Sequence, residues 1–92
     1  KTTNFALGNT ENWVICNGLS ANVTVTLPLA ADWVGREVMI KNTSGTYTVV
    51  SASSNVIGLA GGSAGTAILG ATAGAWVTLV SDGVNWIAMQ GS

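Results

Sequence analysis

The stretch that decides the fold is Trp76-Val77-Thr78-Leu79-Val80-Ser81-Asp82-Gly83-Val84-Asn85-Trp86-Ile87-Ala88-Met89. Two runs rich in β-branched and aromatic residues flank an Asp-Gly pair. This pattern is typical of a β-hairpin, because Asp and Gly tolerate the positive φ angles of a tight turn. The sequence therefore predicts a closing hairpin with Asp82-Gly83 at its tip.

Further short strands are indicated upstream of this hairpin. Residues 22–27 alternate polar and apolar side chains, which places Val23, Val25 and Leu27 on one face of a strand. Residues 37–41 and 47–50 show the same pattern on either side of the turn-forming residues 42–45, so these two strands are expected to form a second hairpin. A further strand is expected at residues 12–16, preceded by one at residues 4–7, and weaker strands are expected at residues 56–59 and 67–69. Residues 29–35 are expected to form one helical turn or a compact loop.

About eight short strands and no long helix predict an all-β fold, a small antiparallel β-sandwich or prism-like domain. Sequence repeats of fixed period are absent, so a solenoid of many rungs is not expected. The 92 residues are enough for a single domain.

The composition points to a partner surface. Only 8% of the residues are charged, against about 25% in an ordinary soluble domain, while 48% are hydrophobic. Cys16 is the only cysteine and histidine is absent, so neither an intrachain disulfide nor a Cys/His zinc cluster can support the small core. Oligomerisation is the remaining support for a chain of this size.

Several functional classes are disfavoured by the same composition. Lys1, Arg36 and Lys41 are scattered and the net charge is −1, so no nucleic-acid partner is expected. Long uncharged stretches are broken by Gly, Ser and Thr, so no membrane insertion is expected either. The absence of histidine excludes a Ser-His-Asp triad.

The acidic residues also have plain structural roles. Glu11, Asp32, Glu37 and Asp82 are the complete supply of side-chain carboxylates, and each lies at a turn, a loop or a strand position. We therefore expect no catalytic residue, no metal and no cofactor. A carboxylate pair assembled between subunits stays open from sequence.

Four tryptophans carry much of the apolar area of this chain. Trp13, Trp76 and Trp86 lie within expected strands. Together with Val77 and Leu79 of the closing hairpin, they are assigned to the core or to a subunit contact.

Trp33 differs because it lies in a loop beside Asp32. It is the best candidate for an exposed ring on which a sugar could stack, with Asp32 and Tyr47 as further possible glycan contacts. The alternative for Trp33 is a structural role in covering the end of the core.

Three segments together resemble a known family. They are Val25-Thr26-Leu27-Pro28, Val34-Gly35-Arg36-Glu37-Val38-Met39-Ile40-Lys41-Asn42 and Trp76-Val77-Thr78-Leu79-Val80-Ser81-Asp82-Gly83-Val84-Asn85-Trp86. In order and spacing they resemble the small β-domains near the C-termini of bacteriophage tail fibre and tailspike proteins, and the match covers roughly residues 22 to 89.

The resemblance implies that residues 1–92 are a single C-terminal domain, a fragment of a longer fibre or spike chain. It implies a homotrimer in the virion that caps the distal end, holds three chains in register and contributes to host attachment without catalysis. Two alternatives remain open. One is a carbohydrate-binding module for bacterial surface polysaccharide, and the other is part of a polysaccharide depolymerase.

Overall fold

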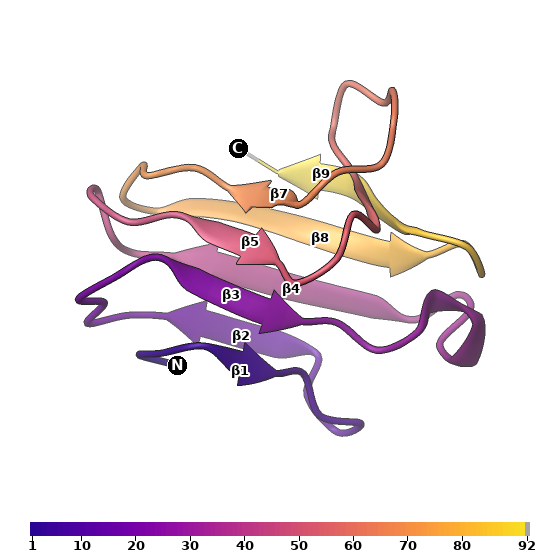
Figure 1. The fold of residues 1–92 in the computed structure, drawn as a ribbon, viewed down its shortest axis with the longest axis horizontal. Coiled ribbons are helices and arrows are strands. Elements are labelled where there is room, and N and C mark those ends of the chain that lie inside the picture. The colour runs from indigo at the N-terminus through magenta and orange to yellow at the C-terminus, as the bar shows by residue number, and fades with distance from the viewer. Residues whose placement is uncertain (92) are drawn as a thin grey trace.

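The computed structural model describes residues 1–91 and consists of two stacked β-sheets (Figure 1). One sheet has four strands in the order β1-β3-β5-β7, and the other has five in the order β2-β4-β8-β9-β6. The strands are β1 (Phe5–Ala6), β2 (Trp13–Cys16), β3 (Val23–Thr26), β4 (Glu37–Asn42), β5 (Val49–Ser51), β6 (Val56–Ile57), β7 (Ala67–Leu69), β8 (Ala75–Ser81) and β9 (Trp86–Gly91). A single 3₁₀ turn, η1 (Ala30–Asp32), joins β3 to β4.

The all-β prediction is confirmed, but the expected antiparallel pairing is wrong because both sheets are mixed. β1, β3 and β5 pair in parallel in one sheet, and β2 and β4 pair in parallel in the other. The chain therefore passes back and forth between the sheets as a flattened coil before it closes with the antiparallel strands β8 and β9. Within residues 1–91, no helix has the length and apolarity that a membrane span requires.

The expected hairpin between residues 37–41 and 47–50 does not form, because β4 and β5 lie in different sheets. The buried side chain of Asn42 fixes this crossing. Its Nδ2 donates to the carbonyl oxygens of Tyr47 (2.8 Å) and Gly70 (2.9 Å), and its Oδ1 accepts the N–H of Ser44 at 3.0 Å. The amide thus satisfies backbone groups where the chain leaves one sheet for the other.

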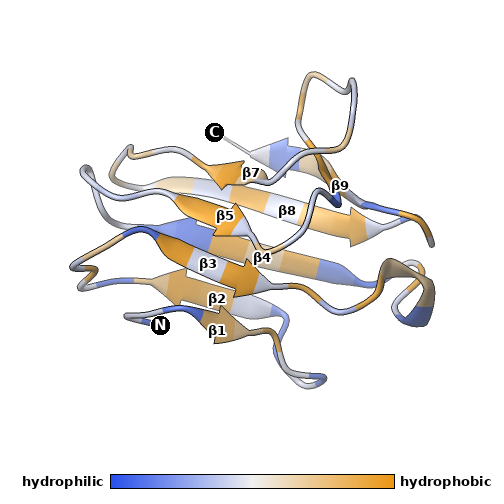
Figure 2. Cartoon of the chain, in the orientation of Figure 1, coloured by the Kyte–Doolittle hydropathy of each residue, from blue (hydrophilic) through white to orange (hydrophobic). Residues whose placement is uncertain are grey.

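The core lies between the two sheets and follows the alternation of each strand. Val23 and Val25 point inward from β3, as the sequence predicts, and Leu27 is also buried. From the other sheet, the inward residues Val77 and Leu79 of β8 meet them, which confirms that these two hairpin residues belong to the core. Figure 2 shows hydrophobic residues on the strands of both sheets.

Two tryptophans close one end of the sandwich. The Trp33 ring packs edge-on against Trp86, with ring centroids 5.9 Å apart, and both side chains are buried. The Trp86 Nε1–H donates to the carbonyl oxygen of Pro28 at 3.0 Å, while the Arg36 guanidinium stacks 3.6 Å from the centre of the Trp33 ring. The compact segment around η1 is therefore a lid over the core.

The closing hairpin is confirmed, although its turn is longer than the Asp-Gly pattern predicts. Ser81 pairs with Trp86, which leaves residues 82–85 as the loop. Only Gly83 has a positive φ, +95°, whereas Asp82 does not. Asp82 acts instead through its carboxylate, which accepts the N–H groups of Asn85 (2.7 Å) and Val84 (2.9 Å); these bonds lower the pKa of Asp82.

We expect Asn42→Ala to lower the free energy of unfolding by about 2–4 kcal/mol, because it leaves buried backbone groups without partners. Chemical denaturation at fixed protein concentration measures this change. Asn12→Ala is the matched control, since Asn12 is exposed and should lose less than about 0.5 kcal/mol. Equal losses in the two variants would contradict the role assigned to Asn42.

Candidate functional site

The five-stranded sheet has a second face, opposite the core, that is also largely apolar. Because side chains alternate along a strand, inward residues are followed by residues that point to this side, except at the register shift between β8 and β9. We call this surface the outer face. Its residues are Trp13, Ile15, Glu37, Met39, Lys41, Ile57, Trp76, Thr78, Val80, Ile87 and Gln90.

Cross-strand pairing brings these side chains into three rows. The central row is Trp13, Met39, Thr78 and Gln90, from four adjacent strands. The second row is Ile15, Lys41 and Trp76. The third row is Glu37, Val80, Ile87 and Ile57.

Large apolar side chains are left open to solvent on this face. Trp13 is 75% exposed and Ile15 is 56% exposed, while Met39, Trp76 and Val80 are half-buried. Large exposed apolar side chains grouped on one face are typical of surfaces that contact a partner or a ligand.

The opposite surface of the molecule provides an internal comparison. The outward residues of the four-stranded sheet include Ala6, Thr24, Thr26 and Val50, which are smaller and include two hydroxyls. These four residues are uncharged, whereas the outer face carries Glu37 and Lys41. The two outer surfaces therefore differ in apolar bulk, and only the five-stranded sheet displays tryptophan.

Thr78 occupies the middle of the outer face and is itself buried. It is 7% exposed, and among the described residues its Oγ1 is the buried side-chain polar atom without a hydrogen-bond partner. An unpaired buried hydroxyl is destabilising relative to a methyl group of the same shape. Because neighbouring atoms cover this oxygen, it is not a contact for a ligand approaching from solvent.

The predicted glycan contacts do not form one site. Trp33, expected as an exposed ring, is 7% exposed and covers the core, so that expectation is wrong and its structural alternative is confirmed. Asp32 lies in η1 before β4, whereas the half-buried Tyr47 follows β4 in the chain. The six-residue strand β4 thus separates them.

The exposed ring belongs to Trp13, which the sequence assigned to the core or a subunit contact. Two shallow hollows flank it. One, of about 160 Å³, is lined by Asn12, Trp13, Glu37, Met39, Thr78 and Gln90. The other, of about 200 Å³, is lined by Trp13, Val14, Ile15, Met39 and Lys41.

The sequence signal for Trp13 was ambiguous because residues 13–16, Trp-Val-Ile-Cys, are all apolar. Alternation is therefore invisible in this strand, and either pair could face the core. Val14 and Cys16 turn inward in the structure. Trp76 lies on the outer face and Trp86 in the core, so the two tryptophans of the closing hairpin have different roles.

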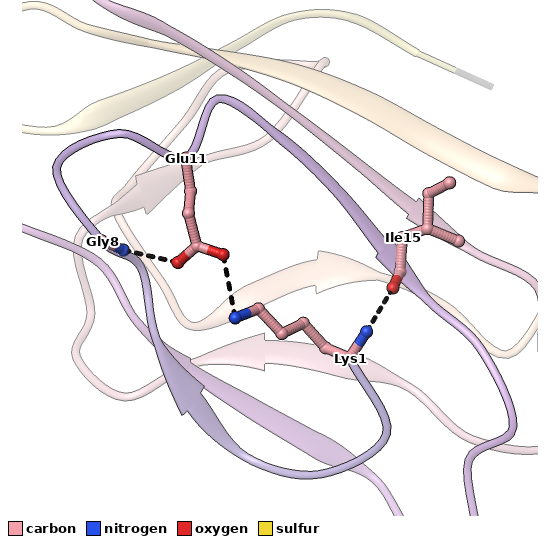
Figure 3. Close-up of polar contacts among 4 residues, drawn as sticks. All are labelled: Lys1, Gly8, Glu11 and Ile15. Carbon is pink, nitrogen blue, oxygen red and sulfur yellow. Dashed lines mark hydrogen bonds and ion pairs between the residues drawn. The ribbon is translucent and has the colours of Figure 1, made fainter.

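One ion pair among the described residues stabilises the edge of this sheet (Figure 3). Lys1 Nζ lies 2.8 Å from Glu11 Oε2, and Glu11 Oε1 accepts the N–H of Gly8 at 2.8 Å. The hydrogen bond from Lys1, followed by that from Gly8, lowers the pKa of Glu11. The Lys1 amino group also donates to the carbonyl oxygen of Ile15 at 2.7 Å, so this cluster covers part of the open side of β2.

The remaining carboxylates are dispersed. Asp32 lies in η1, Asp82 in the hairpin loop and Glu37 on the outer face. Within residues 1–91, no group of three or more His, Cys, Asp or Glu residues is placed to hold a metal ion. The feature that stands out is therefore an apolar surface with sparse charge.

Thr78→Val is expected to raise the free energy of unfolding by about 0.5–1 kcal/mol, since it replaces an unpaired buried hydroxyl by a methyl group in a strand. Ser51→Ala provides the opposite case, because the buried Ser51 hydroxyl donates to Asn55 Oδ1 at 2.6 Å. That variant should lose about 1 kcal/mol. Thermal unfolding distinguishes the two, and a destabilised Thr78→Val protein would show that the hydroxyl is bonded.

No known protein family, no curated protein and no solved structure was found to match this chain.

Proposed function

We propose that this chain is a non-catalytic homo-oligomerisation domain whose copies associate through the outer face. The observation that supports this proposal is the exposed apolar sheet surface around Trp13, Ile15 and Met39. Burial of apolar area contributes about 25 cal/mol per Å², so covering this face with further copies is a substantial source of stability. Closed rotational symmetry allows identical chains to cover it without leaving an open edge.

The resemblance to the C-terminal domains of phage tail fibres and tailspikes favours three copies. In this proposal the trimer caps the distal end of a fibre or spike of the virion, keeps three chains in register and contributes to host attachment. The dispersed carboxylates and the absence of histidine favour a structural role over an enzymatic one. The small hydroxyl-bearing surface of the four-stranded sheet would then face solvent.

Light scattering coupled to size exclusion tests the assembly directly. The native chain is expected to elute as a trimer at micromolar concentration. Met39→Glu places a charge in the central row of the outer face. It should raise the dissociation constant of the trimer at least about 100-fold, because assembly would then bury an unpaired carboxylate.

The matched control is Thr26→Glu, which places the same charge on the exposed outer surface of the four-stranded sheet. It should remain trimeric, and circular dichroism should show both variants folded. A native chain that stays monomeric up to about 100 µM would contradict the proposal.

A second candidate function, carbohydrate binding, is favoured by one specific observation. The exposed Trp13 ring borders a hollow whose lining includes the polar side chains of Asn12, Glu37 and Gln90. An aromatic face bordered by carboxylate and amide groups suits a pyranose of bacterial surface polysaccharide, because the ring covers the sugar's C–H face while polar atoms bond its hydroxyls.

Calorimetric titration of the native chain with purified host polysaccharide tests this candidate. If the sugar stacks on Trp13, Trp13→Ala should weaken binding at least about tenfold, the equivalent of 1.4 kcal/mol. Leu29→Ala removes a similarly exposed apolar side chain outside the outer face and should bind as the native chain does. Equal binding by the native chain and Trp13→Ala would exclude this site.

A further inference from the structure

The only charged residues of the outer face are Glu37 and Lys41, and both lie on β4. They point to the same side and are four residues apart, which corresponds to about 13 Å along a strand that rises about 3.3 Å per residue. Both are exposed, and the ion pair found within residues 1–91, Lys1 with Glu11, involves neither of them.

Their neighbours on adjacent strands are apolar. Lys41 lies between Ile15 of β2 and Trp76 of β8. Glu37 lies beside Val80 of β8. Opposite charges normally stabilise a sheet as direct cross-strand pairs, and the chain has no such pair here.

Association through the outer face would place both charges in or beside an apolar interface. A charge buried there without a partner is strongly unfavourable, and like charges brought together are worse. The second copy must therefore supply a Lys41 for each Glu37. This requirement restricts how β4 is oriented relative to the symmetry axis.

If the axis ran along β4, equivalent residues would meet at the same height, and Glu37 would approach Glu37. If the axis is perpendicular to β4, the Glu37 end of β4 in one copy can approach the Lys41 end of β4 in the next copy. Met39 then lies midway between the two ends of each β4. Only the second arrangement pairs every charge.

We propose that the copies pack with β4 perpendicular to the rotation axis and with Glu37 of each copy paired to Lys41 of the next. This inference rests on the proposed oligomerisation function and adds the orientation in which the copies meet. The two charges then select one orientation of an otherwise non-directional apolar surface.

Charge exchange provides the first test, read as the dissociation constant of the assembly by analytical ultracentrifugation. Glu37→Lys and Lys41→Glu should each weaken association at least about tenfold, because each replaces an attraction by a repulsion. The double variant E37K/K41E restores opposite charges at every contact and should recover most of the native affinity. If the native chain is oligomeric and the double variant does not recover its affinity, the proposed orientation of the copies is wrong, although oligomerisation itself is still supported.

Cysteine crosslinking of variants that keep Cys16 gives the second test. Cys16 is fully buried and burial raises the pKa of its thiol, so mild oxidation should leave it unreacted. The double variant E37C/K41C should form disulfides between copies, up to a covalent trimer, whereas Glu37→Cys alone and Lys41→Cys alone should not.

Crosslinking of Glu37→Cys alone would place the axis along β4 and overturn the inference. An oligomer in which E37C/K41C forms no disulfide would overturn it as well. A native chain found only as a monomer would instead refute the proposed function on which the inference rests.

Discussion

The structure depends on one constraint: the five-stranded sheet has two apolar faces, and its own chain covers only one of them. Strand alternation sends Val38, Ile40 and Leu79 inward, where the four-stranded sheet buries them. The same alternation sends Trp13 and Met39 to the other side, where no element of residues 1–91 lies over them. A sheet with two apolar faces is stable when both are covered. The proposed assembly supplies the second cover.

The contacts at the two ends of the sandwich hold the strands of the outer face in position. Trp33 and Trp86 pack against one another at one end, with Arg36 stacked outside them. The buried Asn42 amide ties the crossing at the far end of β4 to the backbone of Tyr47 and Gly70. Neither set of contacts belongs to the outer face. Both fix β4, the strand that carries Glu37, Met39 and Lys41, so core packing positions the surface at which the copies are proposed to meet.

Much of the local structure could be predicted from sequence, whereas the pairing could not. Residues 22–27 alternate clearly, and the closing hairpin has β-branched and aromatic runs on either side of Asp82-Gly83; the strands form where these patterns indicate. Parallel pairing of β2 with β4 joins segments whose contact leaves no local signal, and the turn residues 42–45 suit a hairpin as well as a crossing between sheets. The candidate site shows the same limit. Trp33 is buried because its loop folds over the core, and the exposure of Trp13 could not be predicted because a fully apolar strand does not reveal its inward face.

The central claim, that further copies cover the outer face, is tested most directly by hydroxyl-radical footprinting of the native chain across a dilution series. Trp13 and Met39 are expected to be protected at high concentration and to become labelled on dilution. Leu29 and Val84, which are exposed elsewhere on the molecule, should be labelled equally throughout. Labelling of Trp13 that does not change with concentration and matches its 75% exposure in the single chain would contradict the claim.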